Sequence, residues 1–526
     1  MGFRKIIQRS PFIWVLIFAS ITLTCSKKST QGKTLRLTLV AEPPTLDSSI
    51  ATDMASITVI SNLMEGLTRF DEKLHPIPAM ADYWKYSASG KSLTFYLRDD
   101  VVWSDGMPVK AQDFEFSWKR MLDPATGSQY AYFLFDIENA FEFNSGKLKN
   151  SEEVGVKALS PKILQVKLKR PVAYFLSLVA FTATFPQRRD LIERYGDLWT
   201  DPQYLVVNGP FSLAERRFEY KLTLRANPHY YAGRPALDRV IFYIVEEANT
   251  ALTLYESGEI DIVNLLPSAV PSYRGHPGFV AREQLTGNYY ALNVRKAPFD
   301  NALVRQAFAY SIDRSRISQI LPSGQLPTSS WIPKGMIGYN PEIGTRFNPK
   351  KARHLLAQAG YPKGLVLPEI TAVYNSNINN RLVAEFLQGQ WKKHLGVEIK
   401  LDSMEWKMFL NRLKVDPPQL YRGSWVADFP DPENFMNLFA SASGNNRSHW
   451  SHSRYDWLVS KAAVEDQLDI RQIFYDEAQA ILTEKEVAII PLFSSMTNQL
   501  VQPYVTGYRP NAMNTINLRT IDLENR

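Results

Sequence analysis

Two histidines, His449 and His452, stand three positions apart, a spacing that can place both imidazoles on one helix face and so hold a metal ion. The chain has only 7 histidines, and no third ligand is evident near this pair. A surface or hydrogen-bonding role is therefore the simpler interpretation. The adjacent acids Glu246 and Glu247 are most simply solvated. These residues predict neither a metal site nor a cofactor.

Motifs of the common catalytic sites are missing from the sequence. It has no Gly-x-x-x-x-Gly-Lys-Ser/Thr phosphate loop, no His-Glu-x-x-His motif and no Gly-x-Ser-x-Gly motif. The single cysteine excludes an intrachain disulfide and any multi-cysteine zinc or iron–sulfur site. An exported hydrolase that uses two carboxylates stays open, because such a pair leaves little trace in a sequence. Nothing argues for one, and we expect no enzyme.

The N-terminus has the order of a secretory signal peptide. Arg4, Lys5 and Arg9 precede an apolar run over residues 11–23, which is shorter than the roughly 20 residues of a membrane-spanning helix. We therefore expect residues 1–24 to be a signal peptide. The mature protein would be exported to the periplasm or the cell envelope.

The only cysteine, Cys25, stands where the apolar run ends, before polar residues. Its place resembles that of the acylated cysteine of bacterial lipoproteins, although Thr22-Leu-Thr24 replaces the usual Leu-(Ala/Ser)-(Gly/Ala). The resemblance implies lipidation of Cys25, a tether over residues 25–33 and attachment to a membrane. The alternatives are an unmodified cysteine in an ordinary signal and an uncleaved anchor.

The basic balance of the chain, a net charge of +7, is concentrated near its start. Six of the positive charges belong to Arg4, Lys5, Arg9, Lys27, Lys28 and Lys33. The body from Thr34 onward is therefore close to neutral. It contains no stretch that is dense in Lys and Arg with interleaved aromatic residues, so nucleic-acid binding loses its electrostatic support.

Strand-like and helix-like segments alternate along the body. Residues 35–40 and 164–168 alternate apolar and polar side chains, as half-buried strands do. Three other segments gather apolar residues on one helical face, and we expect these faces to be core. They are Phe114, Trp118 and Met121; Val304, Ala307, Phe308 and Ile312; and Ile470, Ile473, Phe474 and Ile481. The order predicts an α/β or α+β fold with several sheets.

A succession of motifs covers the body from one end to the other. Its main members are Asn62-Leu-Met-Glu-Gly-Leu-Thr-Arg-Phe-Asp71, Val102-Trp-Ser-Asp-Gly-Met-Pro-Val109, Asn208-Gly-Pro-Phe211, Pro298-Phe-Asp-Asn-Ala-Leu-Val-Arg-Gln-Ala-Phe308 and Trp425-Val-Ala-Asp-Phe-Pro-Asp-Pro432. In this order they closely resemble the solute-binding proteins of peptide and nickel ABC importers, and among them the oligopeptide-binding proteins.

The resemblance implies the two-lobed clamshell of class II periplasmic-binding proteins, an α/β fold, with an additional domain. Lobe I would be discontinuous, over residues 34–64, 186–285 and 495–526. The additional domain would cover residues 65–185 and lobe III residues 286–494. The protein would be a monomer that encloses an oligopeptide by hinge closure and delivers it to the permease subunits of an ABC importer.

An extended peptide offers an ammonium group, a carboxylate and repeating main-chain groups. The segment from Arg422 to Asp428 contains an acid, a base and an extended run that suit these groups. By resemblance, Asp428 holds the peptide α-amine and Arg422 meets the carboxylate of some peptide lengths. The main-chain partners would be Gly423, Ser424, Trp425 and Val426, and Gly423 permits close backbone approach because it has no Cβ. The alternatives are a turn cap for Asp428 and a surface salt bridge for Arg422.

Aromatic residues complete the implied site. Trp425, Trp406 and Tyr130 match positions that line the side-chain pockets of the family, although each is alternatively a core residue. The segment with Asp53 and Met54 would face the ligand from lobe I, where Asp53 would add negative potential.

The sequence also departs from the family's pattern. Some relatives have a disulfide where this chain has Thr286 and Val426, and Leu413 replaces an arginine that relatives use for other peptide lengths. The preferred peptide length is therefore open. Two other functions stay open as well: binding of another solute, such as a dipeptide, a metal chelate, haem or a sugar, and a surface interaction or chaperone role on the same fold.

Overall fold

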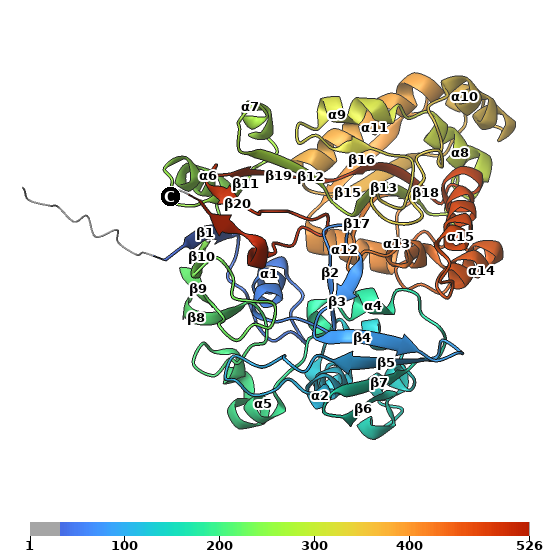
Figure 1. Ribbon diagram of the computed structural model, residues 1–526. Coiled ribbons are helices and arrows are strands. Elements are labelled where there is room, and N and C mark those ends of the chain that lie inside the picture. Colours follow the sequence, from blue (N-terminus) through green and yellow to red (C-terminus); the bar gives the residue numbers. More distant parts are fainter. Residues whose placement is uncertain (1–31, 525–526) are drawn as a thin grey trace, which may run out of the picture. The chain divides into compact units, whose positions relative to one another are not determined.

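The computed structural model describes residues 32–524. The predicted signal peptide (1–24), Cys25 and most of the predicted tether lie outside these residues, so they stay predictions. Strands and helices alternate along the described chain (Figure 1), as the sequence predicted. None of the described helices is both long and apolar enough to cross a membrane.

One four-stranded sheet joins the start of the body to a segment about 200 residues later. Its order is β1 (Thr34–Leu39), β10 (Arg239–Ile244), β9 (Lys221–Ala226) and β8 (Phe211–Arg217). β1 runs parallel to β10, and the other neighbours are antiparallel. Leu35, Leu37 and Leu39 are buried, which confirms the alternating strand predicted over residues 35–40.

A second four-stranded sheet carries α2 (Ala111–Leu122) on one face (Figure 1). Its order is β4 (Ala81–Tyr86), β5 (Ser92–Leu97), β7 (Ile163–Lys167) and β6 (Val156–Ser160). Phe114, Trp118 and Met121 of the helix are fully buried. This confirms the predicted core face.

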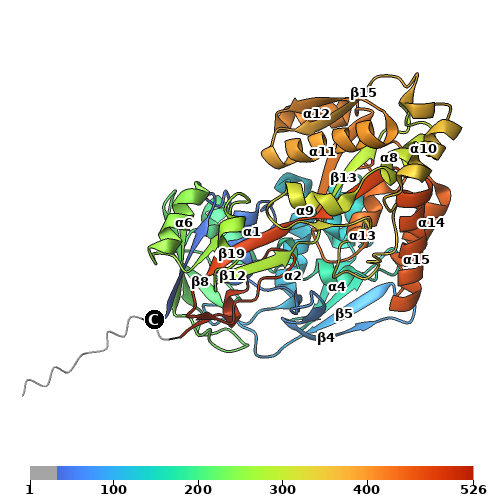
Figure 2. The same cartoon turned by 90° about the horizontal axis from the view of Figure 1, so that it is seen from above.

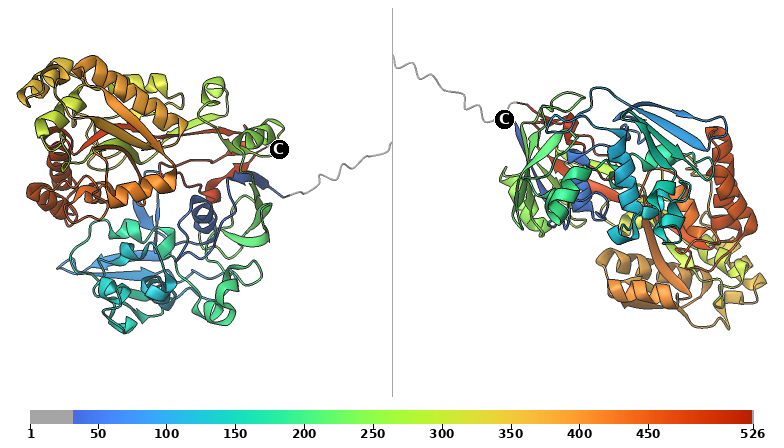
Figure 3. Two further views of the ribbon diagram at one scale, coloured as in Figure 1. Left: turned by 180° about the vertical axis from the view of Figure 1, so that it is seen from behind. Right: turned by 90° about the horizontal axis from the view of Figure 1, so that it is seen from below.

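The six-stranded sheet contains the segment from Arg422 onward. Its order is β14 (Leu326–Pro327), β18 (Ile489–Ser494), β13 (Thr286–Leu292), β17 (Leu420–Val426), β15 (Ile370–Asn375) and β16 (Ile399–Met404). The long helix α11 (Ile378–Leu395) packs against β15 and β16 (Figure 3). In the neighbouring α8 (Ala302–Tyr310) and just beyond it, the apolar face predicted from residue 304 to residue 312 is fully buried, which confirms that prediction.

The core face predicted for residues 470–481 is wrong in part. In α15 (Leu468–Ala480), Ile473 is 63% exposed, whereas Arg471, Tyr475 and Ala478 are buried. The guanidinium of Arg471 donates two hydrogen bonds to the carboxylate of Asp431, at 2.7 and 2.8 Å. Arg471 is therefore buried in the core as half of an ion pair. A pattern of apolar residues does not predict a buried arginine.

The remaining strands form small sheets. β19 (Met496–Val501) lies between β11 (Ile262–Asn264) and β12 (Phe279–Glu283), as Figure 2 shows for β12 and β19. Two strand pairs are β2 (Thr68–Phe70) with β3 (Pro76–Pro78) and β20 (Val505–Thr506) with β21 (Asp522–Leu523).

The other helices are mostly short. They are α1 (Met54–Leu63), α3 (Ala140–Asn144), α4 (Phe175–Leu178), α5 (Arg189–Tyr195), α6 (Ala248–Glu256), α7 (Val270–Tyr273), α9 (Ile317–Ile320), α10 (Pro349–Gln358), α12 (Trp406–Val415), α13 (Glu433–Met436) and α14 (Ser453–Ala462). The division into lobe I, additional domain and lobe III stays a prediction.

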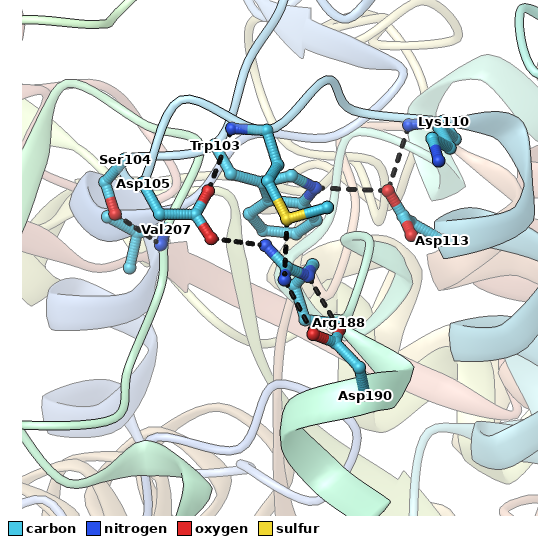
Figure 4. A network of polar contacts seen from close by, with 9 residues as sticks. Trp103, Ser104, Asp105, Lys110, Asp113, Arg188, Asp190 and Val207 are labelled. Carbon is cyan, nitrogen blue, oxygen red and sulfur yellow. Dashed lines mark hydrogen bonds and ion pairs between the residues drawn. The ribbon is translucent and has the colours of Figure 1, made fainter.

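Arg188 links the segment after β5 to the start of α5. Its guanidinium donates to Asp105 at 2.8 Å and to both carboxylate oxygens of Asp190 at 2.7 Å (Figure 4). These partners raise the pKa of Arg188, the Asp190 hydrogen bonds most of all. Nearby, Trp103 Nε1 donates to Asp113 at 3.1 Å near the start of α2. The motif around Trp103 therefore has a structural role.

Candidate ligand-binding site

The strand β17 has one fully paired edge and one edge that is mostly open. On one side it pairs with β13 along its whole length, from Leu420 to Val426. On the other side β15 pairs only with Leu420 and Tyr421. Within the described residues, no strand pairs with residues 422–426 on that side. An open strand edge presents unpaired main-chain donors and acceptors.

The register shows which main-chain groups face the open edge. Ala427 N donates to Leu285 O at 2.9 Å, one position beyond the paired strands. Along an antiparallel strand, the N–H and C=O groups of one residue point toward the partner strand, and those of the next residue point away from it. The N–H and C=O groups of Ser424 and Val426 therefore face away from β13, toward the open edge. Val426 as a whole residue is 58% exposed.

Asp428 lies two residues beyond the end of β17 and is partly buried. Its Oδ2 accepts hydrogen bonds from the Tyr132 hydroxyl at 3.1 Å and from Asn434 Nδ2 at 3.4 Å. Burial raises the pKa of Asp428, while these two hydrogen bonds oppose the rise. The turn that follows is capped by Asp431, which accepts from the backbone N–H of Glu433 at 2.9 Å. Asp431, and not Asp428, therefore caps this turn, and within the described residues only side chains donate to the Asp428 carboxylate.

A cavity of about 560 Å³ opens beside Asp428. Its walls come from two distant parts of the chain, residues 132–178 and residues 425–445. The aromatic residues among them are Tyr132, Phe133, Phe135, Tyr174, Trp425 and Phe429. The predicted residue Trp425 therefore meets Asp428 in one cavity.

Arg422 is a partly buried cation that has no carboxylate partner within the described residues. Its guanidinium donates to Asn375 Oδ1 at 3.4 Å and to Asn288 Oδ1 at 3.2 Å. Burial lowers the pKa of Arg422. Because both partners are neutral amides, the alternative of a surface salt bridge does not describe this side chain.

A second cavity, of about 310 Å³, is lined by Arg422. The predicted residues Gly423, Ser424, Trp425 and Trp406 line it as well. Trp425 belongs to both cavities, which therefore adjoin along the end of β17. A further guanidinium lines this cavity, that of Arg447, which the sequence analysis missed because it lies in a loop with no characteristic pattern.

The packing of the sheet requires a glycine at position 423, which the sequence did not reveal. Its register partner on β13 is Tyr289. A Cβ added at Gly423 would lie 2.2 Å from Cζ of the Tyr289 ring. The ring therefore packs directly on the glycine backbone, and any larger residue at position 423 would clash with it.

We expect Gly423→Ala to lower the free energy of unfolding by about 1–3 kcal/mol, because the new methyl group overpacks against Tyr289. Chemical denaturation measures this change. Gly389→Ala in α11 is the matched control, since a Cβ there meets nothing within 4 Å. The control should gain about 0.5–1 kcal/mol through helix propensity. Equal stabilities for the two variants would contradict the packing argument.

Two predicted residues, Tyr130 and Met54, line neither cavity. Tyr130 packs edge-on against Phe133 at a ring distance of 5.0 Å, and Tyr132, two positions later, takes the place beside Asp428. Met54 begins α1 and is 46% exposed. Asp53 is the N-cap of that helix and accepts from Ser56 N at 2.9 Å.

Other residues named from the sequence also have defined places. Thr286 and Val426 are register partners on β13 and β17, and Leu413 is buried against the second cavity. His452 caps α14 and accepts from Tyr455 N at 3.2 Å, which confirms a hydrogen-bonding role for this histidine. Residues 32–524 contain no cluster of three His, Cys, Asp or Glu that could hold a metal ion.

The chain is similar to bacterial binding proteins over most of its length. The sequence profile of the bacterial extracellular solute-binding proteins, family 5 Middle, matches residues 75–447. The periplasmic murein peptide-binding protein MppA of Escherichia coli K12 is 33% identical over 515 residues, which cover 94% of this chain and 95% of that protein.

Solved structures agree with the sequence match. The MppA murein tripeptide-binding protein in its unliganded open form has a TM-score of 0.84 at 31% identity, over 94% of this chain and 98% of that chain. Haemophilus influenzae OppA in complex with RPPGFSPFR has a TM-score of 0.73 at 29% identity, over 94% and 99%. These likenesses confirm the predicted fold class, the two-lobed class II solute-binding fold. The chain belongs to the bacterial extracellular solute-binding proteins of family 5.

Proposed function

We propose that this protein captures short peptides outside the cytoplasm and delivers them to an ABC importer. One observation carries the proposal: the open edge of β17, with Asp428 beyond one end and Arg422 at the other. A peptide that adds to this edge as a strand gains main-chain hydrogen bonds whatever its sequence. Recognition through the main chain suits a carrier of many different peptides.

The two charged side chains match the two ends of a peptide. Asp428 would receive the α-ammonium group, and Arg422, which has no carboxylate partner within residues 32–524, would receive the carboxylate. Six positions of extended chain, at about 3.3 Å each, separate the two residues by roughly 20 Å. Because the lengths of the two side chains take up part of this span, it suits a peptide of about three to five residues.

The relatives favour a peptide over another solute. The similar Escherichia coli protein is a murein peptide-binding protein, and the Haemophilus influenzae protein was solved with the peptide RPPGFSPFR. We propose peptide binding for this chain too, but we do not assign it the murein peptide or RPPGFSPFR as its ligand. As a solute-binding member of the family, the protein would perform no chemistry, and ATP hydrolysis would belong to its partner subunits.

The remaining parts of the proposal rest on the sequence. Export through residues 1–24 and acylation of Cys25 would hold the protein at a membrane surface, where it meets its permease. It would act as a monomer, and hinge closure of lobe III on lobe I would bury the exposed side chains of Val426, Trp406 and Met54 against the peptide.

Isothermal titration of the purified protein with alanine peptides of two to six residues tests the function. We expect heat of binding for at least one length, and much weaker binding when the same peptide is N-methylated along its backbone, because strand addition needs the N–H groups. Chromatography after incubation should recover the peptide intact. Cleaved peptide would indicate a hydrolase. Binding of a metal chelate, haem or a sugar, with no peptide bound, would indicate another solute.

A further inference from the structure

The cavity beside Asp428 contains a second carboxylate that the proposed function does not use. Glu433, the first residue of α13, is partly buried and lines this cavity. Figures 1 and 2 both place α13 beside α4, whose Leu178 also lines the cavity. The backbone N–H of Glu433 donates to Asp431. Within residues 32–524, however, no group donates a hydrogen bond to the carboxylate of Glu433.

The two guanidinium groups that face Glu433 are already engaged with other carboxylates. Arg471 donates two hydrogen bonds to Asp431, at 2.7 and 2.8 Å. Arg170 donates to Asp136 at 3.1 Å. Each of these guanidinium groups is already neutralised by its own carboxylate partner, so neither fully neutralises the charge of Glu433.

Asp428 and Glu433 therefore share one cavity without a cationic partner of their own. Burial raises the pKa of Glu433 to about 8; the two paired carboxylates add to this rise, and the two guanidinium groups oppose it. Burial thus favours the protonated form of Glu433 when no ligand is bound. A ligand cation that enters the cavity can replace this proton, just as an α-ammonium group can neutralise Asp428.

The walls of the cavity suit a long cationic side chain. Tyr174 and Phe429 stack at a ring distance of 5.6 Å, and both line the cavity together with Phe135 and Trp425. Aromatic faces pack against the methylene stem of lysine or arginine and attract the charged head group. The volume of about 560 Å³ leaves room for such a side chain.

We propose that Glu433 determines specificity by receiving the cationic side chain of the first residue of a bound peptide, so that peptides beginning with arginine or lysine are preferred. This inference rests on the proposed function, because Asp428 must hold the α-ammonium group of that same residue. The two positive charges of the residue then meet the two carboxylates that lack a cationic partner. A first residue without charge leaves the proton on Glu433.

Glu433→Gln tests the inference, because glutamine keeps the shape and removes the charge. The probes are the peptides Arg-Ala-Ala, Ala-Ala-Arg and Ala-Ala-Ala, titrated calorimetrically. We expect the wild type to bind Arg-Ala-Ala at least tenfold more tightly than Ala-Ala-Ala. The variant should lose this preference while its affinity for Ala-Ala-Ala changes less than threefold. Glu138→Gln, which removes an exposed carboxylate two residues after Asp136, should keep the preference.

The pH dependence supplies a second readout. Because Glu433 must lose its proton to pair with the ligand cation, the preference for Arg-Ala-Ala over Ala-Ala-Ala should rise by about tenfold or more between pH 6 and pH 8 and then level off. Both peptides carry the same α-ammonium group, so its titration cancels in the ratio. The groups that act on Glu433 from neighbouring elements remain in the variant, whose ratio should stay flat. They are Asp136, Arg170, Asp431, Arg471 and the phenols of Tyr132, Tyr174, Tyr455 and Tyr475, with Asp428 in the same cavity.

The outcomes separate the inference from the proposed function. If the wild type binds Ala-Ala-Ala but shows no preference for Arg-Ala-Ala, or if Glu433→Gln keeps the preference, the role of Glu433 is wrong and peptide capture stands. A preference for Ala-Ala-Arg over Arg-Ala-Ala would likewise refute it. If no peptide binds at all, the proposed function fails first. An unchanged affinity of the variant for Ala-Ala-Ala shows that it has folded.

Discussion

Asp428→Asn is expected to weaken the binding of peptides with a free α-amine by about 30-fold or more. Removing one partner of a desolvated, hydrogen-bonded charge pair costs about 2–5 kcal/mol, and each 1.4 kcal/mol is a factor of ten in affinity. Asparagine has nearly the same shape and can still accept the hydrogen bonds that Tyr132 and Asn434 give to Asp428. The loss is therefore expected in binding, measured by calorimetry, and not in folding.

An N-acetylated peptide is the control for this variant, because it carries no ammonium group. The wild type should bind the acetylated peptide weakly, and Asp428→Asn should bind it about as well as the wild type does. If the variant bound free and acetylated peptides as differently as the wild type does, the ammonium group would have to be held elsewhere.

Arg471→Met is expected to lower the free energy of unfolding by about 3–5 kcal/mol, because it leaves the carboxylate of Asp431 buried without its cation. Both side chains are more than nine-tenths buried, and the two hydrogen bonds between them measure 2.7 and 2.8 Å. Guanidinium denaturation followed by tryptophan fluorescence measures the loss. The double variant Asp431→Asn/Arg471→Met should recover part of it, since the stranded charge is gone.

Arg454→Met is the matched control for Arg471→Met. Arg454 forms the same paired hydrogen bonds with Glu477, at 2.8 and 2.9 Å, but both side chains are more than one-third exposed. Exposed ion pairs contribute about 0–1 kcal/mol, so this variant should unfold almost like the wild type. Similar losses at the two sites would contradict the role assigned to burial.

The amphipathic patterns predicted the elements well wherever apolar side chains alone fill the core. Phe114, Trp118 and Met121 of α2 are buried as their spacing predicts, and so is the face that begins at Val304. The pattern failed in α15, because there the core takes in Arg471. A buried arginine needs a partner such as Asp431, which lies 40 positions away in the sequence, and local periodicity cannot reveal such a distant pair.

The candidate site was only partly predictable, because a local sequence pattern does not show which distant residues come together. Asp428, Arg422 and Trp425 lie in one segment, so a resemblance over that segment names them together. Tyr132 joins Asp428 only because the chain folds residues 132–178 against residues 425–445. Glu433 lies five positions after Asp428, just beyond the motif that ends at Pro432, so the resemblance did not single it out. The resemblance implied main-chain binding by residues 423–426, but only Ser424 and Val426 among them face the open edge. This depends on the register with β13 and on where β15 stops pairing, which the sequence does not reveal.

Native mass spectrometry of the protein purified from cells tests the central claim most directly, because it weighs what the protein carries. The account predicts complexes heavier than the free protein by the masses of peptides of about three to five residues. After release, sequencing should show free α-amines and an excess of arginine or lysine at the first position. A bound metal chelate, haem or sugar, or a protein that never carries a peptide, would contradict the account.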